Sequence, residues 1–300
     1  MTFNDGSDIR NSRVRRRGRT TGIAAGGGGL LVVGLFVISQ LLGVDLTGLA
    51  GIAGGGSASG GGLSEPGSVL AECQTGQDAN ENVDCRVQGT VTSLDDYWTA
   101  EAPALGIEFR FPEAAIFDQA TATACGNATS ATGPFYCPGD ETIYLDTSFY
   151  DDLRSRYGAN GGPLAELYVI AHEYGHHIQQ ISGIFDRADR SGTGPDSDSV
   201  RIEVQADCFA GAWVAAASTT DDAAGTRFLE PVTSQQVADA LSAASAVGDD
   251  RIQEAAGAGV NPETWTHGSS EMRQRWFTTG FDEGAGACDT FAVGADELVG

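Results

Sequence analysis

Residues 164–183, LAELYVIAHEYGHHIQQISG, form the stretch around which the rest of the chain is organised. Apolar residues recur in it at intervals of three and four, which predicts a helix with one face turned to a hydrophobic core. Pro163 stands at the first helical position, where its missing N–H has no consequence, and Gly183 is placed to end the helix. We therefore expect a helix that is central to the fold.

Two histidines of this helix, His172 and His176, lie four residues apart and therefore point from the same face. Glu173 follows the first histidine and is close enough to reach a water molecule held between the two. This H-E-x-x-H arrangement is typical of zinc hydrolases, with both histidines as metal ligands. The alternative is a pair of core histidines flanking a buried glutamate, which would itself need a partner. His177 points about 100° away from the other two and is left out of the predicted site.

A catalytic zinc site needs a third protein ligand. The segment 201–213, RIEVQADCFAGAW, belongs to a second predicted helix, in which Glu203 and Asp207 share one face. If this helix returns alongside the first, Glu203 can serve as the third ligand, with Asp207 accepting the N–H of a ligand imidazole. Two alternatives stay open: Asp207 on the metal with Glu203 behind it, or an ordinary solvated acidic face.

The remaining histidine, His267, precedes a predicted helix at about residues 270–279. This side chain can stabilise the anionic tetrahedral intermediate of a hydrolysis, or it can simply cap the helix that follows; we favour the catalytic role. Arg273 and Arg275 have a similar pair of interpretations, stabilisation of negative charge or surface ion pairs.

The net charge of the chain is −24, and it is divided unevenly. Residues 1–19 hold six arginines and two aspartates, whereas the rest of the chain holds 11 arginines and 39 acidic residues. Because so acidic a body repels nucleic acid and anionic lipid, we exclude nucleic acid as a partner.

The N-terminus predicts a membrane anchor. A basic N-terminal tail, residues 1–21, precedes an uncharged run at residues 22–44. As a helix this run would be roughly 34 Å long, enough for a hydrocarbon core of about 30 Å. The arginines before it and Asp45 after it predict a single-pass protein of the cell membrane, with a cytoplasmic N-terminus and an extracytoplasmic main domain. A cleaved signal peptide is the alternative, but the apolar region is long and no A-x-A site follows it.

Residues 45–64 are Gly/Ser-rich and predict a linker, so we expect the folded domain at residues 65–300. All six cysteines fall in this domain, at Cys73, Cys85, Cys125, Cys137, Cys208 and Cys288. Their even number fits disulfides formed in an oxidising compartment outside the cytoplasm. Proximity along the chain favours pairing the first with the second and the third with the fourth, which leaves the last two. A cysteine zinc site is the rival interpretation, but no C-x-x-C spacing occurs.

Strand-like stretches occupy the first half of this domain, at residues 85–94, 105–111 and 142–145, and predicted helices follow them. Strands first and helices afterwards predict an α+β fold. The expected architecture is a small N-terminal β region and then a helical part carrying the H-E-x-x-H helix, all preceded by a single transmembrane helix.

Four longer segments resemble the bacterial family of putative neutral zinc metallopeptidases. They are GPFYCPGDETIYLD at 133–146, AHEYGHHIQ at 171–179, VRIEVQADCFAGAW at 200–213 and THGSSEMRQRWFTTGF at 266–281. The resemblance also covers the predicted anchor and the GVDLTGL after it, so it extends over nearly the whole chain. It implies a membrane-tethered, zincin-like domain.

Carried over residue by residue, the resemblance implies that His172 and His176 are zinc ligands and that Glu173 is the catalytic glutamate. The pair Glu203 and Asp207 is similar to the third-ligand helix of gluzincins such as thermolysin. His267 followed by Arg273 resembles a pattern found in membrane-bound gluzincins.

The sequence therefore predicts a membrane-anchored zinc peptidase, with one Zn²⁺ per chain, Glu173 as general base and peptides or proteins as substrates. Two alternatives remain open. One is a non-catalytic, zinc-stabilised extracytoplasmic binding or scaffold protein, and the other is a zinc amidase acting on cell-wall peptides.

Overall fold

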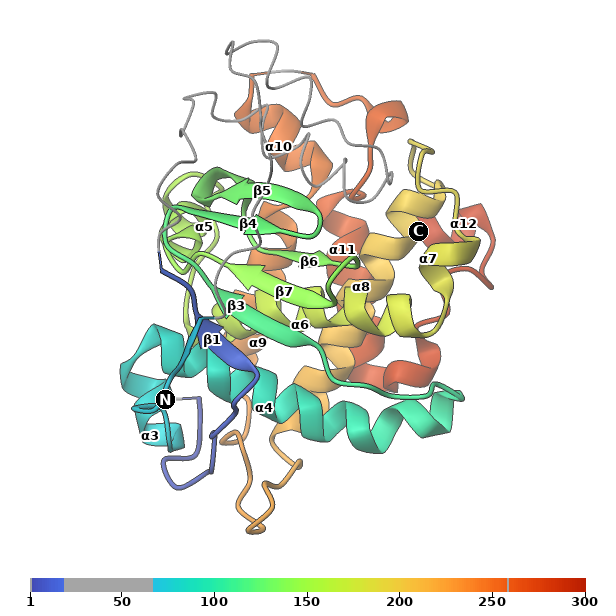
Figure 1. The fold of residues 1–300 in the computed structure, drawn as a ribbon. Helices are drawn as coiled ribbons and strands as arrows, with labels where there is room; N and C mark the ends of the chain where they lie inside the picture. Colours follow the sequence, from blue (N-terminus) through green and yellow to red (C-terminus); the bar gives the residue numbers. More distant parts are fainter. Residues whose placement is uncertain (1, 19–66, 258) are drawn as a thin grey trace.

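The computed structural model describes residues 2–18, 67–257 and 259–300. In this part of the chain the fold is α+β: a mixed sheet covers one side of a central helix, and further helices pack on its other sides (Figure 1). The α+β class expected from the sequence is therefore correct, but the predicted order of its elements is not.

The main sheet has the strand order β2-β1-β3-β7-β6. The pairs β1–β3 and β3–β7 are parallel, whereas β1–β2 and β6–β7 are antiparallel, and β4–β5 form a separate antiparallel ribbon. The strand bounds are β1 Val14–Arg16, β2 Ser68–Val69, β3 Glu113–Ile116, β4 Ala120–Thr123, β5 Gly126–Thr129, β6 Phe135–Cys137 and β7 Thr142–Leu145.

Helices make up about half of the described chain. Their bounds are α3 Gly76–Glu81, α4 Val83–Glu101, α5 Phe149–Ser155, α6 Pro163–Ile181, α7 Ile184–Arg187, α8 Asp198–Ala217, α9 Ser234–Ala246, α10 Asp249–Ala255, α11 Ser270–Glu283 and α12 Ala295–Val299. The described chain also contains short 3₁₀ turns, at η1 Ala102–Leu105, η2 Ser130–Thr132, η3 Pro262–Thr264 and η4 Ala285–Ala287.

Helix α6 is the predicted central helix, and it begins with Pro163 as expected. Helices α4, α8 and α9 and strands β6 and β7 all contact it, so almost every residue from Leu164 to Gln179 is buried. A helix surrounded in this way exposes neither of its faces to bulk water. Its histidines therefore lie inside the protein.

Helices α8 and α11 pack unusually closely because glycines replace side chains where they cross. A Cβ atom added to Gly280 would lie 1.8 Å from the carbonyl oxygen of Cys208, and one added to Gly211 would lie 1.9 Å from that of Phe277. Neither contact is physically possible, so only glycine allows this approach. The crossing brings α11, which carries Arg273, next to α8, which carries Glu203 and Asp207.

The predicted N-terminal β region is wrong in two places. Residues 85–94 lie inside helix α4, whose N-cap is Asn82; its side chain accepts the N–H groups of Asp84 and Cys85. Residues 105–111 form no strand, and the next strand begins only at Glu113. The predicted strand at residues 142–145 is confirmed as β7.

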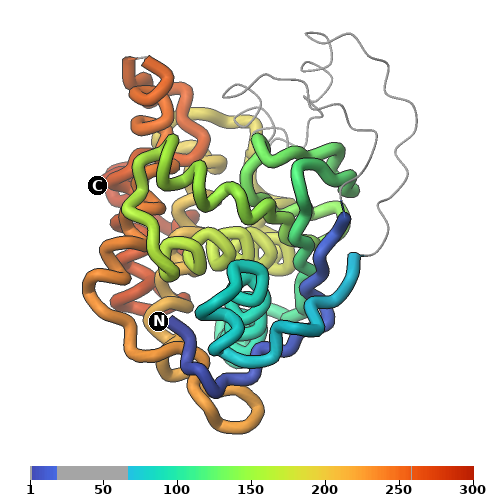
Figure 2. Tube along the Cα trace, turned by 90° about the vertical axis from the view of Figure 1, so that its left-hand side faces the viewer, coloured from blue at the N-terminus to red at the C-terminus, as the bar shows by residue number. Residues whose placement is uncertain are grey.

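The N-terminal residues belong to the folded domain rather than to a separate basic tail. Phe3, Ile9 and Val14 are fully buried, and β1 lies inside the sheet between β2 and β3. Figure 2 shows this segment running along the lower edge of the molecule and up beside the sheet. The boundary predicted at residue 65 therefore leaves out residues 2–18, which pack against α4 and β3.

The transmembrane helix of the predicted fold is not supported by the structure. In the ranges 2–18, 67–257 and 259–300, no helix combines the length and the apolarity that crossing a bilayer requires. The run predicted as an anchor, residues 22–44, lies outside the described residues.

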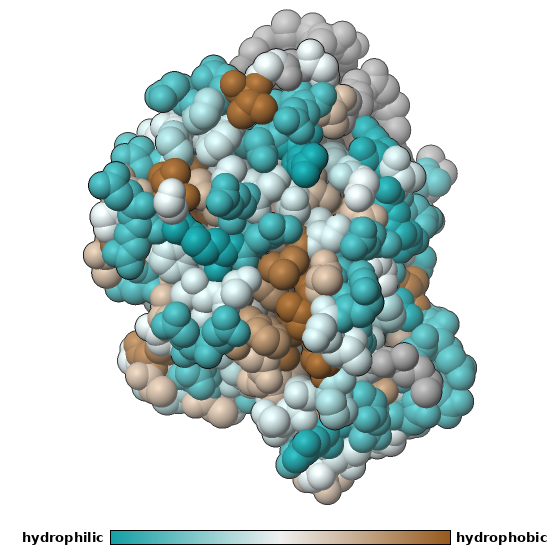
Figure 3. Space-filling view, turned by 180° about the vertical axis from the view of Figure 1, so that it is seen from behind, coloured by the Kyte–Doolittle hydropathy of each residue, from teal (hydrophilic) through white to brown (hydrophobic). Residues whose placement is uncertain are grey.

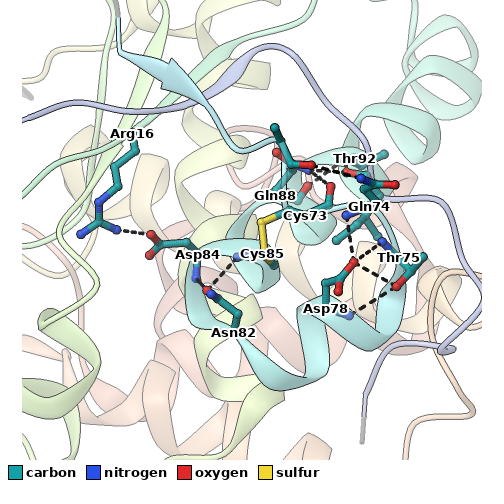
Figure 4. Close-up of a disulfide and its surroundings, with 12 residues drawn as sticks. Arg16, Cys73, Gln74, Thr75, Asp78, Asn82, Asp84, Cys85, Gln88 and Thr92 are labelled. Carbon is teal, nitrogen blue, oxygen red and sulfur yellow. Dashed lines mark hydrogen bonds and ion pairs between the residues drawn. A yellow bond between two sulfur atoms is a disulfide. The ribbon is translucent and has the colours of Figure 1, made fainter.

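The six cysteines form three disulfides, Cys73–Cys85, Cys125–Cys137 and Cys208–Cys288. These are the pairs that proximity along the chain favours. Figure 4 shows the first of them, where it joins the segment before α3 to the first turn of α4. Beside it the side chain of Gln88 donates to the carbonyl of Cys73, so this corner is held by a covalent bond and a buried hydrogen bond.

Candidate metal centre

Helices α6 and α8 bring His172, His176 and Glu203 together. One possible ligand atom from each lies within 4.8 Å of the other two, and all three side chains are buried. Glu203 Oε2 is 3.3 Å from His172 Nε2, and Glu203 Oε1 is 3.6 Å from His176 Nε2. The imidazole rings stand edge to face, with 4.7 Å between centroids, so both Nε2 atoms face the carboxylate.

This convergence depends on Gly175, the residue before the second histidine. A Cβ atom at this position would lie 3.0 Å from Cα of Ala206 on α8 and 3.2 Å from its carbonyl oxygen. Such contacts are tighter than normal packing allows, so any side chain here would push α6 and α8 apart. Since Glu203 must reach across from α8 to the two imidazoles, the glycine keeps it within reach.

His172 is held by a buried aspartate. Its Nδ1 lies 2.9 Å from Asp207 Oδ1, which also accepts the hydroxyl of Tyr168 at 2.5 Å. Arg273 grips the same carboxylate through two bonds, Nε to Oδ2 at 2.7 Å and Nη2 to Oδ1 at 3.0 Å. Because a carboxylate accepts, His172 donates through Nδ1 and leaves its Nε2 lone pair toward Glu203.

His176 is held by a chain of glutamines that runs to the C-terminal region. Its Nδ1 lies 2.8 Å from Gln179 Oε1, and Gln179 Nε2 donates to Gln205 Oε1 at 3.0 Å. Gln205 Nε2 in turn donates to the carbonyl of Cys288 at 2.8 Å. An amide oxygen only accepts, so the Nδ1 of His176 carries its proton and Nε2 is again free for a metal.

The residues fit a divalent metal ion. Glu203 Oε1 is buried without a hydrogen-bond partner among the residues that the structure describes, which is unfavourable unless a cation faces it. Two neutral Nε2 atoms and a carboxylate are the donor set of a catalytic zinc site. Burial acts to lower the pKa of His172, but Asp207 and Glu203 outweigh it and raise that pKa to about 10. The carboxylates around His172 therefore favour positive charge at this position, which a bound cation would supply.

Glu173 lies buried beside this group, between the metal ligands and the edge of the sheet. Burial raises the pKa of its carboxyl above the ordinary value, while the two ligand histidines and the N–H of Tyr136 act in the opposite direction. The residue therefore sits where a base would serve the metal site.

His267 lines the same cleft as the metal-binding group, and an aspartate orients it. Its Nδ1 lies 3.1 Å from Asp249 Oδ1. The other oxygen of Asp249 accepts the backbone N–H groups of residues 266–268, at 2.7 to 3.1 Å. Burial acts to lower the pKa of His267, but Asp249 and Glu203 raise it above the ordinary value. This histidine is therefore suited to donate a proton or a hydrogen bond into the cleft.

The two arginines considered from the sequence lie in different places, and only one of them is at the candidate centre. Arg273 is buried at the site, 4.0 Å from Glu203 Oε2. Arg275 points away from it and donates to the carbonyl of Leu298 near the C-terminus. Only Arg273 acts on the charges of the candidate centre.

The cleft beside the metal-binding group has a volume of about 180 Å³ and a mostly apolar lining. Its apolar walls come from α5, α6, α7, α9 and α10, and include Phe149, Leu153, Val169, Phe185, Val247 and Ile252. Strand β6 and the turn before it form another side. In the view from behind (Figure 3), apolar side chains gather in a hollow near the middle of a mostly hydrophilic face. An extended chain with apolar side chains suits such a cleft.

Sequence reasoning missed several residues that support the site: Tyr168, Gln179, Gln205 and Asp249. Two of them carried a signal, because Tyr168 stands one turn before His172 and Gln179 one turn after His176 on the same helix. Asp249 lies 18 residues before His267, and no periodic pattern joins the two.

The histidine left out of the predicted site is also buried and fully bonded. His177 lies 2.6 Å through Nε2 from the carbonyl of Arg110, and 3.0 Å through Nδ1 from the hydroxyl of Tyr136. Burial lowers its pKa to about 4, so the ring is neutral. It takes no part in the metal-binding group, as expected.

Comparison with known proteins gives a consistent result. The family model described as "Putative neutral zinc metallopeptidase" matches residues 4–291. An uncharacterized protein of Mycobacterium tuberculosis (strain H37Rv) is 47% identical over 230 residues, 76% of this chain and 77% of the relative. The uncharacterized protein YpfJ of Escherichia coli (strain K12) is 36% identical over 278 residues, 90% of this chain and 88% of the relative. No solved structure matches the chain.

Proposed function

Because the chain belongs to the family described as putative neutral zinc metallopeptidases, we propose that it is a zinc-dependent peptidase. The observation that carries the proposal is the buried group of His172, His176 and Glu203, in which Glu203 Oε1 accepts no hydrogen bond from the described part of the chain. Bound Zn²⁺ supplies a Lewis acid and lowers the pKa of a coordinated water to about 7.

The chain's own residues would divide the remaining work. Asp207 and Gln179 fix the two imidazoles with Nε2 toward the metal position. Glu173 takes the proton of the attacking water and hands it to the leaving amine. His267, oriented by Asp249, donates to the oxyanion of the tetrahedral intermediate, an interaction worth about 3–4 kcal/mol in comparable sites.

A peptide substrate is supported by the surroundings of the centre. Strand β6 is the last strand of the main sheet as far as the structure describes it, and it lines the cleft. A strand at the edge of a sheet can pair with an extended peptide. The apolar walls of the cleft favour an apolar side chain next to the bond that is cleaved.

The proposal extends to the compartment. All six cysteines are paired, so no free thiol remains in this chain. Disulfides persist in oxidising environments, which supports a place outside the cytoplasm for the folded domain.

The decisive experiment uses Glu173→Gln in the full chain. This variant should keep one zinc ion per chain, measured by metal analysis, while hydrolysis of a peptide library stops. Full activity in the variant would remove the mechanism, and hydrolysis of cell-wall fragments but not peptides by the parent would favour an amidase.

The matched metal-site variant is Glu203→Ala, which should lose zinc under the same dialysis. Retention of zinc in Glu203→Ala would show that the metal is held elsewhere. A parent that binds zinc but has no hydrolytic activity would leave a structural zinc protein instead.

A further inference from the structure

His177 is a buried residue of α6 that the proposed function does not use. Both of its ring nitrogens are engaged, and the chemistry of the partners fixes which one carries the proton. The carbonyl oxygen of Arg110 only accepts, so Nε2 donates to it at 2.6 Å. Nδ1 is then an acceptor, and it receives the hydroxyl of Tyr136 at 3.0 Å.

Tyr136 is the middle residue of β6, and it joins this strand to α6 at two points. Its backbone N–H faces the carboxyl group of Glu173 and acts to lower the pKa of that group, and its hydroxyl bonds to His177, four residues further along the helix. The rings of Tyr136 and His177 also meet edge to face, with 5.5 Å between centroids. Tyr136 therefore meets α6 at two residues, Glu173 and His177, which lie on either side of the helical turn that leads to His176.

This attachment matters because it ties β6 directly to α6. Strand β6 is also held at its end by the Cys125–Cys137 disulfide, which leads to the turn between β4 and β5 and not to α6. It pairs only with β7 among the described strands, through Phe135↔Tyr144, Tyr136↔Ile143 and Cys137↔Thr142. Phe135 and Tyr136 also line the cleft. The bond between Tyr136 and His177 thus sets how far the strand stands from the metal-binding helix.

We propose that His177 is a positioning residue for substrate: it holds strand β6 at the distance from Glu173 at which a peptide can pair with the strand and reach the metal centre. The proposal rests on the proposed peptidase function. His177 itself touches neither the metal ligands' donor atoms nor the cleft. It acts through Tyr136, and through Arg110 it ties the segment before β3 to the same helix.

The test compares Tyr136→Phe and His177→Phe with a matched control, Tyr174→Phe. Tyr174 is a buried tyrosine of α6 whose ring meets that of His177 edge to face at 5.9 Å, but its hydroxyl bonds to Asp95 of α4, so Tyr174→Phe keeps the ring contact and removes a hydroxyl that does not reach β6. In zinc-loaded full chain, the first two variants should raise KM for a peptide about five- to tenfold, as expected for one lost hydrogen bond, with kcat changed less than about threefold. The control should keep the KM of the parent.

Two further variants sharpen the result. The double variant Tyr136→Phe/His177→Phe should raise KM no more than His177→Phe alone, because that change already removes the bond to Tyr136. His177→Gln has an amide that can donate to Arg110 and accept from Tyr136, so it should recover part of the loss. If His177→Phe does not fold, Tyr136→Phe carries the test.

A readout without activity separates this inference from the function on which it rests. Amide hydrogen exchange of residues 135–137 should be faster in Tyr136→Phe and in His177→Phe than in the parent, and unchanged in Tyr174→Phe. Parent-like exchange and KM in both variants would overturn the inference. A parent that cleaves no peptide would instead refute the peptidase function, and faster exchange confined to these variants would still establish that His177 positions β6.

Discussion

Helix α6 presents a tyrosine to a buried aspartate on each of two sides, and the two clusters differ in a way that separates function from architecture. On one side Asp207 of α8 accepts the hydroxyl of Tyr168 and the guanidinium of Arg273. On the other, Asp95 of α4 accepts the hydroxyl of Tyr174 at 2.8 Å and the guanidinium of Arg13. Each cluster thus contains one aspartate, one arginine and one tyrosine, and in both clusters the tyrosine belongs to α6.

The two clusters differ in the burial of their arginines, since Arg13 is partly exposed and Arg273 is buried. They also differ in the further partner of each aspartate, which is His172 for Asp207 and Asn11 for Asp95. Arg273 is buried and binds Asp207 through two nitrogens, and His172 adds a further bond. Burial acts to raise the pKa of Asp207, but Arg273 and His172 lower it to about 2. At Asp95 burial is the stronger effect and raises the pKa to about 6, although Arg13, Tyr174 and Asn11 oppose it.

Asp207 therefore stays charged across the physiological range, and it can hold His172 in the tautomer that a metal needs. Asp95 changes its charge near neutral pH, and its partners Arg13 and Asn11 lie in the N-terminal segment. The first cluster prepares a site, whereas the second attaches one part of the fold to another.

Replacing the arginines should produce the largest difference in stability between the two clusters. Arg273→Met leaves Asp207 and Glu203 buried without their cation, so the free energy of unfolding of the metal-free protein should fall by about 3–5 kcal/mol. Arg13→Met should lower it by only about 2 kcal/mol, because Asp95 can take up a proton. Urea unfolding at pH 7 measures both values. Equal losses would mean that the clusters do not differ in charge.

The next largest effect should be a dependence of the free energy of unfolding on pH, caused by Asp95. Asp95 has a folded-state pKa of about 6 and an ordinary value of 3.8, so between these values the folded state binds more protons than the unfolded state. Its contribution to the free energy of unfolding is therefore full below about pH 4 and falls by up to about 3 kcal/mol as pH rises to 6.

The measurement compares the parent with Asp95→Asn, which resembles the protonated side chain and does not titrate. The difference in unfolding free energy between the two proteins should change between pH 4 and pH 6 with the sign given above. A difference that is independent of pH would show that Asp95 is charged throughout this range.

Metal affinity should respond to one cluster alone. Asp207→Asn removes the negative charge behind His172, so its zinc dissociation constant should rise about 10- to 100-fold. Asp95→Asn should bind zinc as the parent does. Competition with a chromophoric chelator measures both constants, and similar weakening in the two variants would contradict a special role for Asp207.

The smallest effects are expected from the tyrosine hydroxyls. Tyr168→Phe and Tyr174→Phe each remove one buried hydrogen bond and should lower the free energy of unfolding by about 1 kcal/mol. Only Tyr168→Phe should also weaken zinc binding, by less than tenfold, since its hydroxyl bonds to the aspartate behind His172. Zinc affinity altered by Tyr174→Phe would show that the two sides of α6 are coupled.

The parts of the site that sequence could predict are those set by helical period. His172 and His176 share a face because they are four residues apart, and Glu203 and Asp207 repeat this spacing on α8. The return of α8 alongside α6 was also expected, from the length of the segment between the two motifs, but the contacts of the N-terminal segment were beyond such reasoning. Asp95 and Arg13 are 82 residues apart in the chain, so only the folded packing brings them together.

The error at residues 85–94 has a local cause. Val87, Thr90, Val91 and Thr92 are β-branched and favour strands when considered alone. In α4 the hydroxyls of Thr90 and Thr92 instead donate to the carbonyls four residues before them. Burial of Val87 and Val91 then decides for the helix, which propensity could not show.

The pairing of β1 with β2 has a consequence for how the chain can be cut. Arg16 and Ser68 are register partners, so the strand that ends at Arg16 and the strand that begins at Ser68 are neighbours in the sheet. A protease that nicks the polypeptide between these points would produce two pieces, with Phe3, Ile9 and Val14 of the smaller one still enclosed by the larger. We expect the pieces to co-purify as a complemented pair, held by the sheet and by the contact of Arg13 with Asp95.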